Sequence, residues 1–141
     1  MKKISLLGST GSIGTSTLDV VRNNPEDFQV VALALGRNLE EAARQVEEFQ
    51  PQLVSVANPE DRDPLKKLIK STVDITAGPS GAEAVAAHPD SDYVLSAIVG
   101  AAGLTPTLAA IRAGKTIGLA NKETMVVAGE FMNAEAKAAG V

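Results

Sequence analysis

Short apolar runs alternate along the chain with longer stretches in which apolar residues recur at helical spacing. The runs are rich in Val, Leu, Ile and Ala, as is typical of parallel strands that are covered on both faces. They predict strands at residues 4–7, 30–35, 53–57, 73–76, 93–98 and 116–119.

The intervening stretches predict helices. Residues 39–49 repeat apolar side chains at helical spacing and are followed by Pro51. Asn58 and Pro59 are typical of a capped helix start with proline in the first turn. The predicted helices cover residues 13–23, 39–49, 59 to 68 or 69, 81–87 and 104–113, and another begins near residue 122 or 123.

Strands and helices that alternate in this way favour a parallel sheet, because right-handed crossovers place helices on its faces. The sequence therefore predicts one α/β domain over residues 1–141, a Rossmann-type, doubly wound and mainly parallel sheet with helices on both faces. Ligands of such sheets bind beyond the carboxyl ends of the strands, so the residues after each strand are the candidates for function.

The first strand is followed by a glycine-rich turn. Residues 8–14 read GSTGSIG, so the glycines are spaced GxxGxxG, a variant of the GxGxxG pattern of dinucleotide-binding domains. Free amides at the start of the next helix, with the positive end of its dipole, favour a pyrophosphate there, and Thr10 and Ser12 offer hydroxyl donors. The alternative is a glycine-rich turn without a ligand, but its place between the first strand and a helix favours binding.

The turn after the second strand indicates which dinucleotide is bound. A domain that selects NAD usually carries Asp or Glu there, but residues 36–38 read Gly-Arg-Asn. No carboxylate repels a 2′-phosphate, and Arg37 supplies a planar, permanently charged donor. We therefore predict a preference for NADP(H), against the alternative that Arg37 is an ordinary surface arginine.

Two later segments also follow predicted strands. Residues 96–103 are mostly small, which allows a flat ring or a ribose to approach the backbone. Residues 121–123 read Asn-Lys-Glu at the end of the sixth strand. They are either ligand contacts or an ordinary helix start, with Asn121 as cap and Glu123 complementing the dipole.

Composition narrows the functional class. The net charge of −4 gives no reason to expect nucleic acid or an anionic membrane as partner. Cysteine is absent, which excludes disulfides and thiolate metal sites. No signal peptide and no apolar stretch of membrane-spanning length are visible, so we expect a cytoplasmic protein. Aromatic residues make up only 3% of the chain, so the core must be aliphatic.

Several ungapped motifs together resemble those of the 1-deoxy-D-xylulose 5-phosphate reductoisomerase family. They are GSTGSIG at residues 8–14, LDVV at 18–21, AIVGAAG at 97–103, TLAAIRAGK at 107–115 and LANKE at 119–123. The resemblance extends over nearly the whole chain and is more specific than a glycine loop alone.

The resemblance implies an NADPH-dependent enzyme of non-mevalonate isoprenoid biosynthesis. Such an enzyme isomerises and reduces a phosphorylated ketose, 1-deoxy-D-xylulose 5-phosphate, to 2-C-methyl-D-erythritol 4-phosphate. It uses a divalent metal, Mg²⁺ or Mn²⁺, and family members look homodimeric.

The resemblance also implies roles for particular residues. Residues 10–13 would hold the pyrophosphate and residues 36–38 the adenosine phosphate, where many family members have lysine in place of Arg37. Lys122 would contact the phosphorylated substrate. The implied cofactor-binding residues are Gly8, Thr10, Gly11, Ser12, Ile13, Gly14, Gly36, Arg37, Asn38, Ala97, Asn121 and Glu123, the last two on the nicotinamide half.

In this family the acidic metal ligands lie beyond the matched region, so we expect no metal site in this chain. Its one histidine, His88, precedes Pro89 and is expected at the surface. We expect an amino-terminal part of a larger enzyme that binds NADPH but does not turn over substrate by itself.

Two alternatives remain. One is another NADP-dependent dehydrogenase, of the semialdehyde or homoserine type, although residues 121–123 favour the reductoisomerase. The other is a non-catalytic NADP(H)-sensing module, for which the sequence shows neither an effector domain nor a partner surface.

Overall fold

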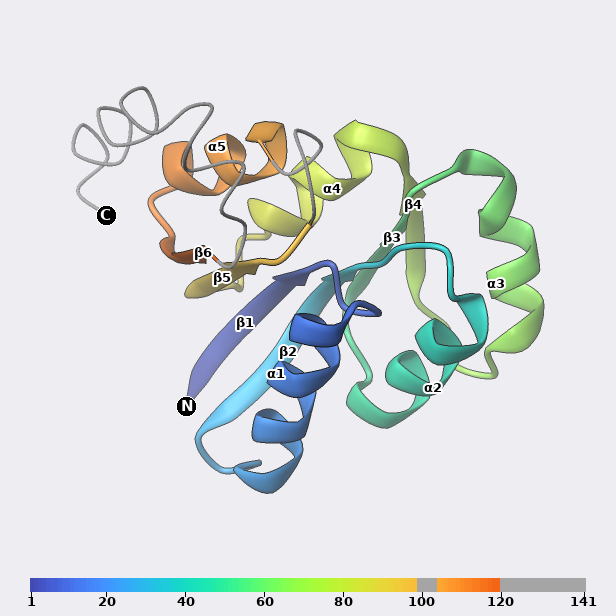
Figure 1. Cartoon of the computed structure of the whole chain (residues 1–141), viewed down its shortest axis with the longest axis horizontal. Helices are drawn as coiled ribbons and strands as arrows, with labels where there is room; N and C mark the ends of the chain where they lie inside the picture. The colour runs from blue at the N-terminus through green and yellow to red at the C-terminus, as the bar shows by residue number, and fades with distance from the viewer. Residues whose placement is uncertain (99–103, 120–141) are drawn as a thin grey trace.

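The architecture is a single parallel sheet with helices on both faces (Figure 1). The computed structural model describes residues 1–98 and 104–119. The sheet has six strands in the order β4-β3-β2-β1-β5-β6, and every neighbouring pair is parallel. The strands are β1 (Lys2–Leu7), β2 (Phe28–Ala34), β3 (Leu53–Val56), β4 (Asp74–Ala77), β5 (Tyr93–Ser96) and β6 (Thr116–Leu119). The predicted doubly wound α/β fold is confirmed.

The helices divide between the two faces of the sheet (Figure 1). Those on one face are α1 (Ser12–Asn23), α2 (Leu39–Phe49) and α3 (Arg62–Leu68), while α4 (Gly78–Ala86) and α5 (Leu104–Arg112) cover the other. The chain moves outward from β1 to β4 and then returns to place β5 on the far side of β1. The strand order therefore reverses between β1 and β5, where ligands of such sheets bind.

The core is aliphatic, as the scarcity of aromatic residues predicts. Beneath α2 and α3, the buried cluster consists of Leu35, Ala42, Ala43, Val46, Val54, Val56 and Leu65. On the opposite face, Val85 and Ala110 pack on Leu7, Val31 and Val94. Burying each of the larger side chains stabilises the folded state by about 1.5–3 kcal/mol. The turns that follow the strands are therefore attached to a well-packed core.

One predicted helix differs in the structure. The segment expected to run from residue 59 begins as a 3₁₀ turn, η1 (Pro59–Asp61), before α3 begins at Arg62. A continuous α-helix would place Pro64 in its interior, where the ring clashes with the carbonyl four residues earlier. The break at Arg62 places Pro64 in a first turn instead. Asn58 stands at the N-cap of η1 and Pro59 in its first turn, as predicted, but the side chain of Asn58 makes no capping hydrogen bond.

Other boundaries shift by a few residues. The helix expected from residue 81 begins at Gly78, because Pro79 suits a first helical turn. Strand β5 ends at Ser96, so Ala97 and Ile98 belong to the turn that follows it. The helix expected near residue 122 lies outside the described residues. None of the described helices is long and apolar enough to cross a membrane.

A carboxylate on α2 ties this helix to the loop before β4. Glu47 accepts hydrogen bonds from the amides of Lys70 (2.6 Å) and Ser71 (2.9 Å) and from the Ser71 hydroxyl (3.1 Å). These donors favour the charged form, so the amide of Ser71 first and that of Lys70 second lower the pKa of Glu47 below its usual value of 4.5.

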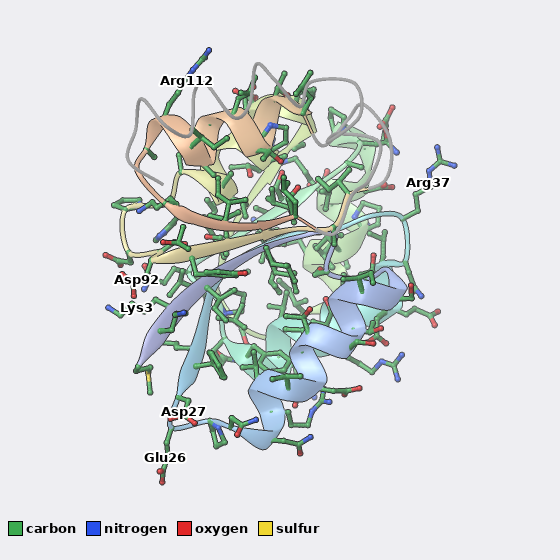
Figure 2. The ribbon with its side chains drawn as sticks, turned by 60° about the vertical axis from the view of Figure 1, so that its left-hand side comes forward. Lys3, Glu26, Asp27, Arg37, Asp92 and Arg112 are labelled. Atoms are coloured by element: carbon green, nitrogen blue, oxygen red, sulfur yellow. The ribbon has the colours of Figure 1, made fainter. Side chains whose placement is uncertain are left out.

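We expect Glu47→Gln to reduce stability at neutral pH but not in strong acid. A carboxyl whose pKa is lower in the folded state stabilises the fold above its unfolded pKa and loses that contribution as the pH falls through the folded value. Urea unfolding between pH 7 and pH 2.5 should show the difference from the parent chain shrinking below about pH 4.5. Glu26→Gln, at an outward-pointing residue (Figure 2), is the control and should follow the parent profile. A constant difference across the range would contradict this assignment.

Candidate functional site

The turn after β1 is held tightly against two neighbouring strands. Gly8 has φ +87°, a conformation that side chains other than glycine rarely adopt. Its amide and that of Ser9 both donate to the carbonyl of Ala34 at the end of β2 (2.8 and 3.0 Å). A Cβ on Gly8 would lie 2.8 Å from the carbonyl oxygen of Ala97 after β5. The turn therefore sits at the point where the strand order reverses.

The other two glycines of the motif have different physical roles. A Cβ on Gly14 would lie 2.2 Å from the carbonyl oxygen of Gly8 and 2.7 Å from the backbone of Ser9, so α1 packs directly on the turn. A Cβ on Gly11 would meet the Gly8 carbonyl at an ordinary 3.6 Å. Gly14 is thus required by packing, whereas Gly11 leaves open space beside the helix start.

The start of α1 presents unpaired backbone donors. The first helical bond of α1 runs from Thr15 to the carbonyl of Gly11 (2.9 Å). Four amides before it donate to no carbonyl of the described residues: those of Thr10, Ser12, Ile13 and Gly14. The first turn of α1 carries no acidic residue, whereas that of α2 carries two. The positive end of the α1 dipole is therefore left for an anion from outside the fold.

The turn after β2 is joined to the first turn. The amide of Gly36 donates to Oγ1 of Thr10 (3.1 Å), which leaves the hydroxyl proton of Thr10 free to bind a ligand oxygen. Asn38 caps α2, since its Oδ1 accepts from the amide of Glu41 (3.1 Å). Arg37 is the residue directly before this cap.

Arg37 is exposed and points outward from this edge of the molecule (Figure 2). It lies on the side opposite the strand starts, which Lys3 and Asp92 mark in the same view. Its guanidinium forms no ion pair within residues 1–98 and 104–119. A permanently charged, unpaired donor at the carboxyl edge is free to bind an anionic ligand.

A cavity of about 510 Å³ runs along this edge, a size usual for small-molecule sites. Predicted residues from three turns line it: Gly8, Thr10, Gly11, Gly36, Arg37, Asn38 and Ala97. Ser12, Ile13 and Gly14 stand beside it in the first turn of α1, and the side chain of Ile13 is 49% exposed. The structure thus gathers the predicted residues between Gly8 and Ala97 at one site.

Residues 4–129 match the family model of 1-deoxy-D-xylulose 5-phosphate reductoisomerase. The chain belongs to this family. The reductoisomerases of Geobacillus sp. (strain WCH70) and Geotalea uraniireducens (strain Rf4) are 49% and 54% identical to it across the whole chain. The chain spans 37% of the length of each of these relatives.

Solved reductoisomerases share the architecture. The enzyme from Zymomonas mobilis, in complex with NADPH, gives a TM-score of 0.93 at 38% identity over 99% of this chain and 37% of that one. A reductoisomerase in complex with magnesium gives 0.95 at 36% identity, over 99% of this chain and 36% of the other. A homoserine dehydrogenase from Thiobacillus denitrificans is less similar, with a TM-score of 0.62 at 25% identity over 99% of this chain and 28% of that one.

Part of the cavity at the carboxyl edge of the sheet was not found from the sequence. Its wall also includes Ser55, Val56 and Ala57 at the end of β3, and Gly78 and Pro79 at the start of α4. A signal was present, because the ends of all parallel strands share one edge, and β3 and β4 end there as well. The predicted residues Asn121, Lys122 and Glu123 lie outside the described residues.

No metal centre is found within residues 1–98 and 104–119, since no three His, Cys, Asp or Glu side chains gather there around one point. His88, which was expected at the surface, is partly exposed. Its Nδ1 accepts a hydrogen bond from the amide of Asp90 (3.2 Å) in the turn after α4. This bond gives His88 a local role in the turn.

Proposed function

We propose that this chain binds NADPH along the carboxyl edge of its sheet and forms the nucleotide-binding unit of a 1-deoxy-D-xylulose 5-phosphate reductoisomerase. The observation that supports this most strongly is the set of unpaired amides at the start of α1, which open toward a cavity with Arg37 on its rim. Family members have been solved in complex with NADPH and in complex with NADPH, fosmidomycin and magnesium.

The residues present fit a dinucleotide with an additional phosphate. The amides of residues 10 and 12–14 would donate to the pyrophosphate, and the hydroxyls of Thr10 and Ser12 would add two further donors. Arg37 would pair with the 2′-phosphate, while Gly36 and Asn38 shape the turn around it. Gly8 and Ala97 would allow the cofactor to lie close to the backbone.

The nicotinamide half would lie toward β5 and β6. We propose that Asn121 and Glu123 contact it and that Lys122 contacts the phosphate of a phosphorylated ketose, 1-deoxy-D-xylulose 5-phosphate. Bound NADPH supplies a hydride for the reduction that follows isomerisation to give 2-C-methyl-D-erythritol 4-phosphate. The described residues offer no metal cluster, so we assign no part of the magnesium chemistry to them. We further propose that the active protein is a homodimer; a cytoplasmic location stays a prediction from the sequence.

The direct test is titration of this chain with NADPH and NADH, followed by fluorescence of the nicotinamide and by the melting temperature. We expect saturable binding of NADPH, a clear preference over NADH, and a stabilisation of about 2.7 kcal/mol at a hundred-fold excess over Kd. Ketose phosphate reduction is expected from a protein of the relatives' full length and not from these 141 residues. A folded sample that binds neither cofactor would refute the proposal, and binding without any turnover in the longer protein would favour an NADP(H)-sensing module.

A further inference from the structure

Gln45 is a buried polar residue on the otherwise apolar inner face of α2. Its side chain is only 2% exposed, and its buried neighbours on the helix are Ala42, Ala43 and Val46. Its Nε2 donates to the carbonyl oxygen of Ser9 (2.9 Å), 36 residues earlier in the chain. The amide of Gln45 thus reaches from α2 into the turn between β1 and α1.

Stability alone does not account for this amide. The Oε1 atom of Gln45 is buried and has no hydrogen-bond partner among the described residues. A buried acceptor without a donor costs free energy, which an apolar side chain of similar size, such as methionine, would avoid. Nε2 of Gln45 also donates to Oε1 of Glu41 on the same helix, at a longer 3.5 Å. The hydrogen bond to Ser9 is therefore the link between α2 and the turn that an apolar replacement could not supply.

The geometry of the peptide unit links this bond to the ligand side of the turn. In a planar trans peptide the carbonyl and the following amide point in opposite directions. Because the carbonyl of Ser9 points toward Gln45 on α2, the amide of Thr10 points away from α2. That amide is one of the unpaired donors, and Thr10 lines the cavity.

The same helix carries the other anion-binding turn. Asn38 caps α2, and Arg37 immediately precedes it. A second link, from the amide of Gly36 to Oγ1 of Thr10 (3.1 Å), joins the two turns directly. Two hydrogen bonds, one from Gln45 and one from Gly36, therefore hold the turn of residues 8–14 at a set position relative to residues 36–38.

We infer that Gln45 is a positioning residue for the pyrophosphate of the cofactor, acting through the Ser9–Thr10 peptide. This inference rests on the proposed function, since it requires a dinucleotide at the turn. Gln45 touches no ligand itself. It fixes the direction of the Thr10 amide, so that this donor is already aimed when the cofactor arrives and no ordering of the turn is needed on binding.

The test is Gln45→Met, which keeps the length of the side chain and removes both the donor and the unpartnered acceptor. Binding of NADPH, NADH and adenosine 2′-monophosphate is measured by calorimetry. The first two contain the pyrophosphate and the third contains only the 2′-phosphate. We expect the affinities for NADPH and NADH to fall by the same factor, about 10-fold. The affinity for adenosine 2′-monophosphate and the melting temperature of the protein without ligand should stay unchanged. Gln29→Met, at an exposed position near the start of β2, is the matched control and should leave all three affinities unchanged.

The outcomes separate this inference from the proposed function. Equal losses for all three ligands would mean that Gln45 only supports the fold, and unchanged affinities would mean that the bond is not used; either result overturns the inference while NADPH binding by the parent chain stands. Failure of the parent chain to bind NADPH would overturn both.

If Gln45→Met does not fold, the parent chain is titrated with NADPH and followed by NMR. The side-chain amide protons of Gln45 should then shift together with the Thr10 amide while those of Gln29 stay in place, and unshifted Gln45 protons would overturn the inference.

Discussion

Gly14→Ala is expected to lower the melting temperature of the chain by about 10 °C and to abolish measurable NADPH binding. The new methyl group would lie 2.2 Å from the Gly8 carbonyl oxygen, against backbone atoms that cannot rotate away. Relief requires α1 to move off the turn. Overpacking of this kind costs about 3 kcal/mol, which corresponds to roughly 3–4 °C per kcal/mol for a domain of this size. Circular dichroism melts and NADPH titration measure the two effects.

Gly11→Ala is the matched variant at the same motif. Its methyl group would meet only the Gly8 carbonyl, at 3.6 Å, so the melting temperature should stay within about 2 °C of the parent value. The methyl group would nevertheless occupy the space beside the free amides, where a phosphate oxygen must lie. We expect NADPH affinity to fall about 100-fold, equivalent to about 2.7 kcal/mol. Parent-like affinity in Gly11→Ala would mean that the amides of α1 do not bind the pyrophosphate.

Arg37→Ala is expected to weaken NADPH binding by about 10- to 150-fold and to leave NADH binding unchanged. A hydrogen bond to a charged group contributes about 1.5–3 kcal/mol, and the 2′-phosphate that would receive it is absent from NADH. Because Arg37 is exposed, water and salt screen its pairing with the phosphate. We therefore expect a loss of NADPH affinity toward the lower end of this range. Calorimetric titration of both cofactors at low and physiological ionic strength measures the effect.

Arg44→Ala is the control for the loss of one positive charge. Arg44 is exposed on α2, pairs with Glu41 and does not line the cavity. Its removal should change NADPH affinity by less than two-fold, and Arg37→Lys should retain most of the preference because it keeps the charge. Equal losses in Arg37→Ala for NADPH and NADH would remove the guanidinium from the 2′-phosphate subsite.

Most of the fold could be predicted from the sequence, because the strands and helices of this sheet are marked by residues that lie close together in the chain. The apolar runs and helical repeats gave all six strands and the helix over residues 39–49 with its bounds as found. The errors lie where a local signal was misjudged. Asn58 and Pro59 suggested a continuous helix, but Pro64 further along divides the segment into a 3₁₀ turn and a short α-helix.

The candidate site was predictable in part for a related reason. Turns that follow strands can be identified from sequence, and a glycine-rich turn and an arginine at such places indicate an anion site. Strands β3 and β4 also end at this edge, but Ser55 and Ala57 are small, uncharged residues that no pattern of charge or glycine spacing marks as ligand contacts. Their part in the cavity became visible only when the strand order brought them beside the first two turns.

By itself, the sequence determined the alternation of strands and helices, the parallel sheet and the position of the glycine-rich turn after the first strand. Each of these depends on residues close together in the chain. The tertiary structure alone decided that Gly14 packs on the Gly8 carbonyl, that Gln45 bonds to Ser9 and that Thr10 bonds to Gly36. These contacts depend on how closely α1 and α2 approach the turn, a distance set by the packing of the whole sheet that no local pattern encodes.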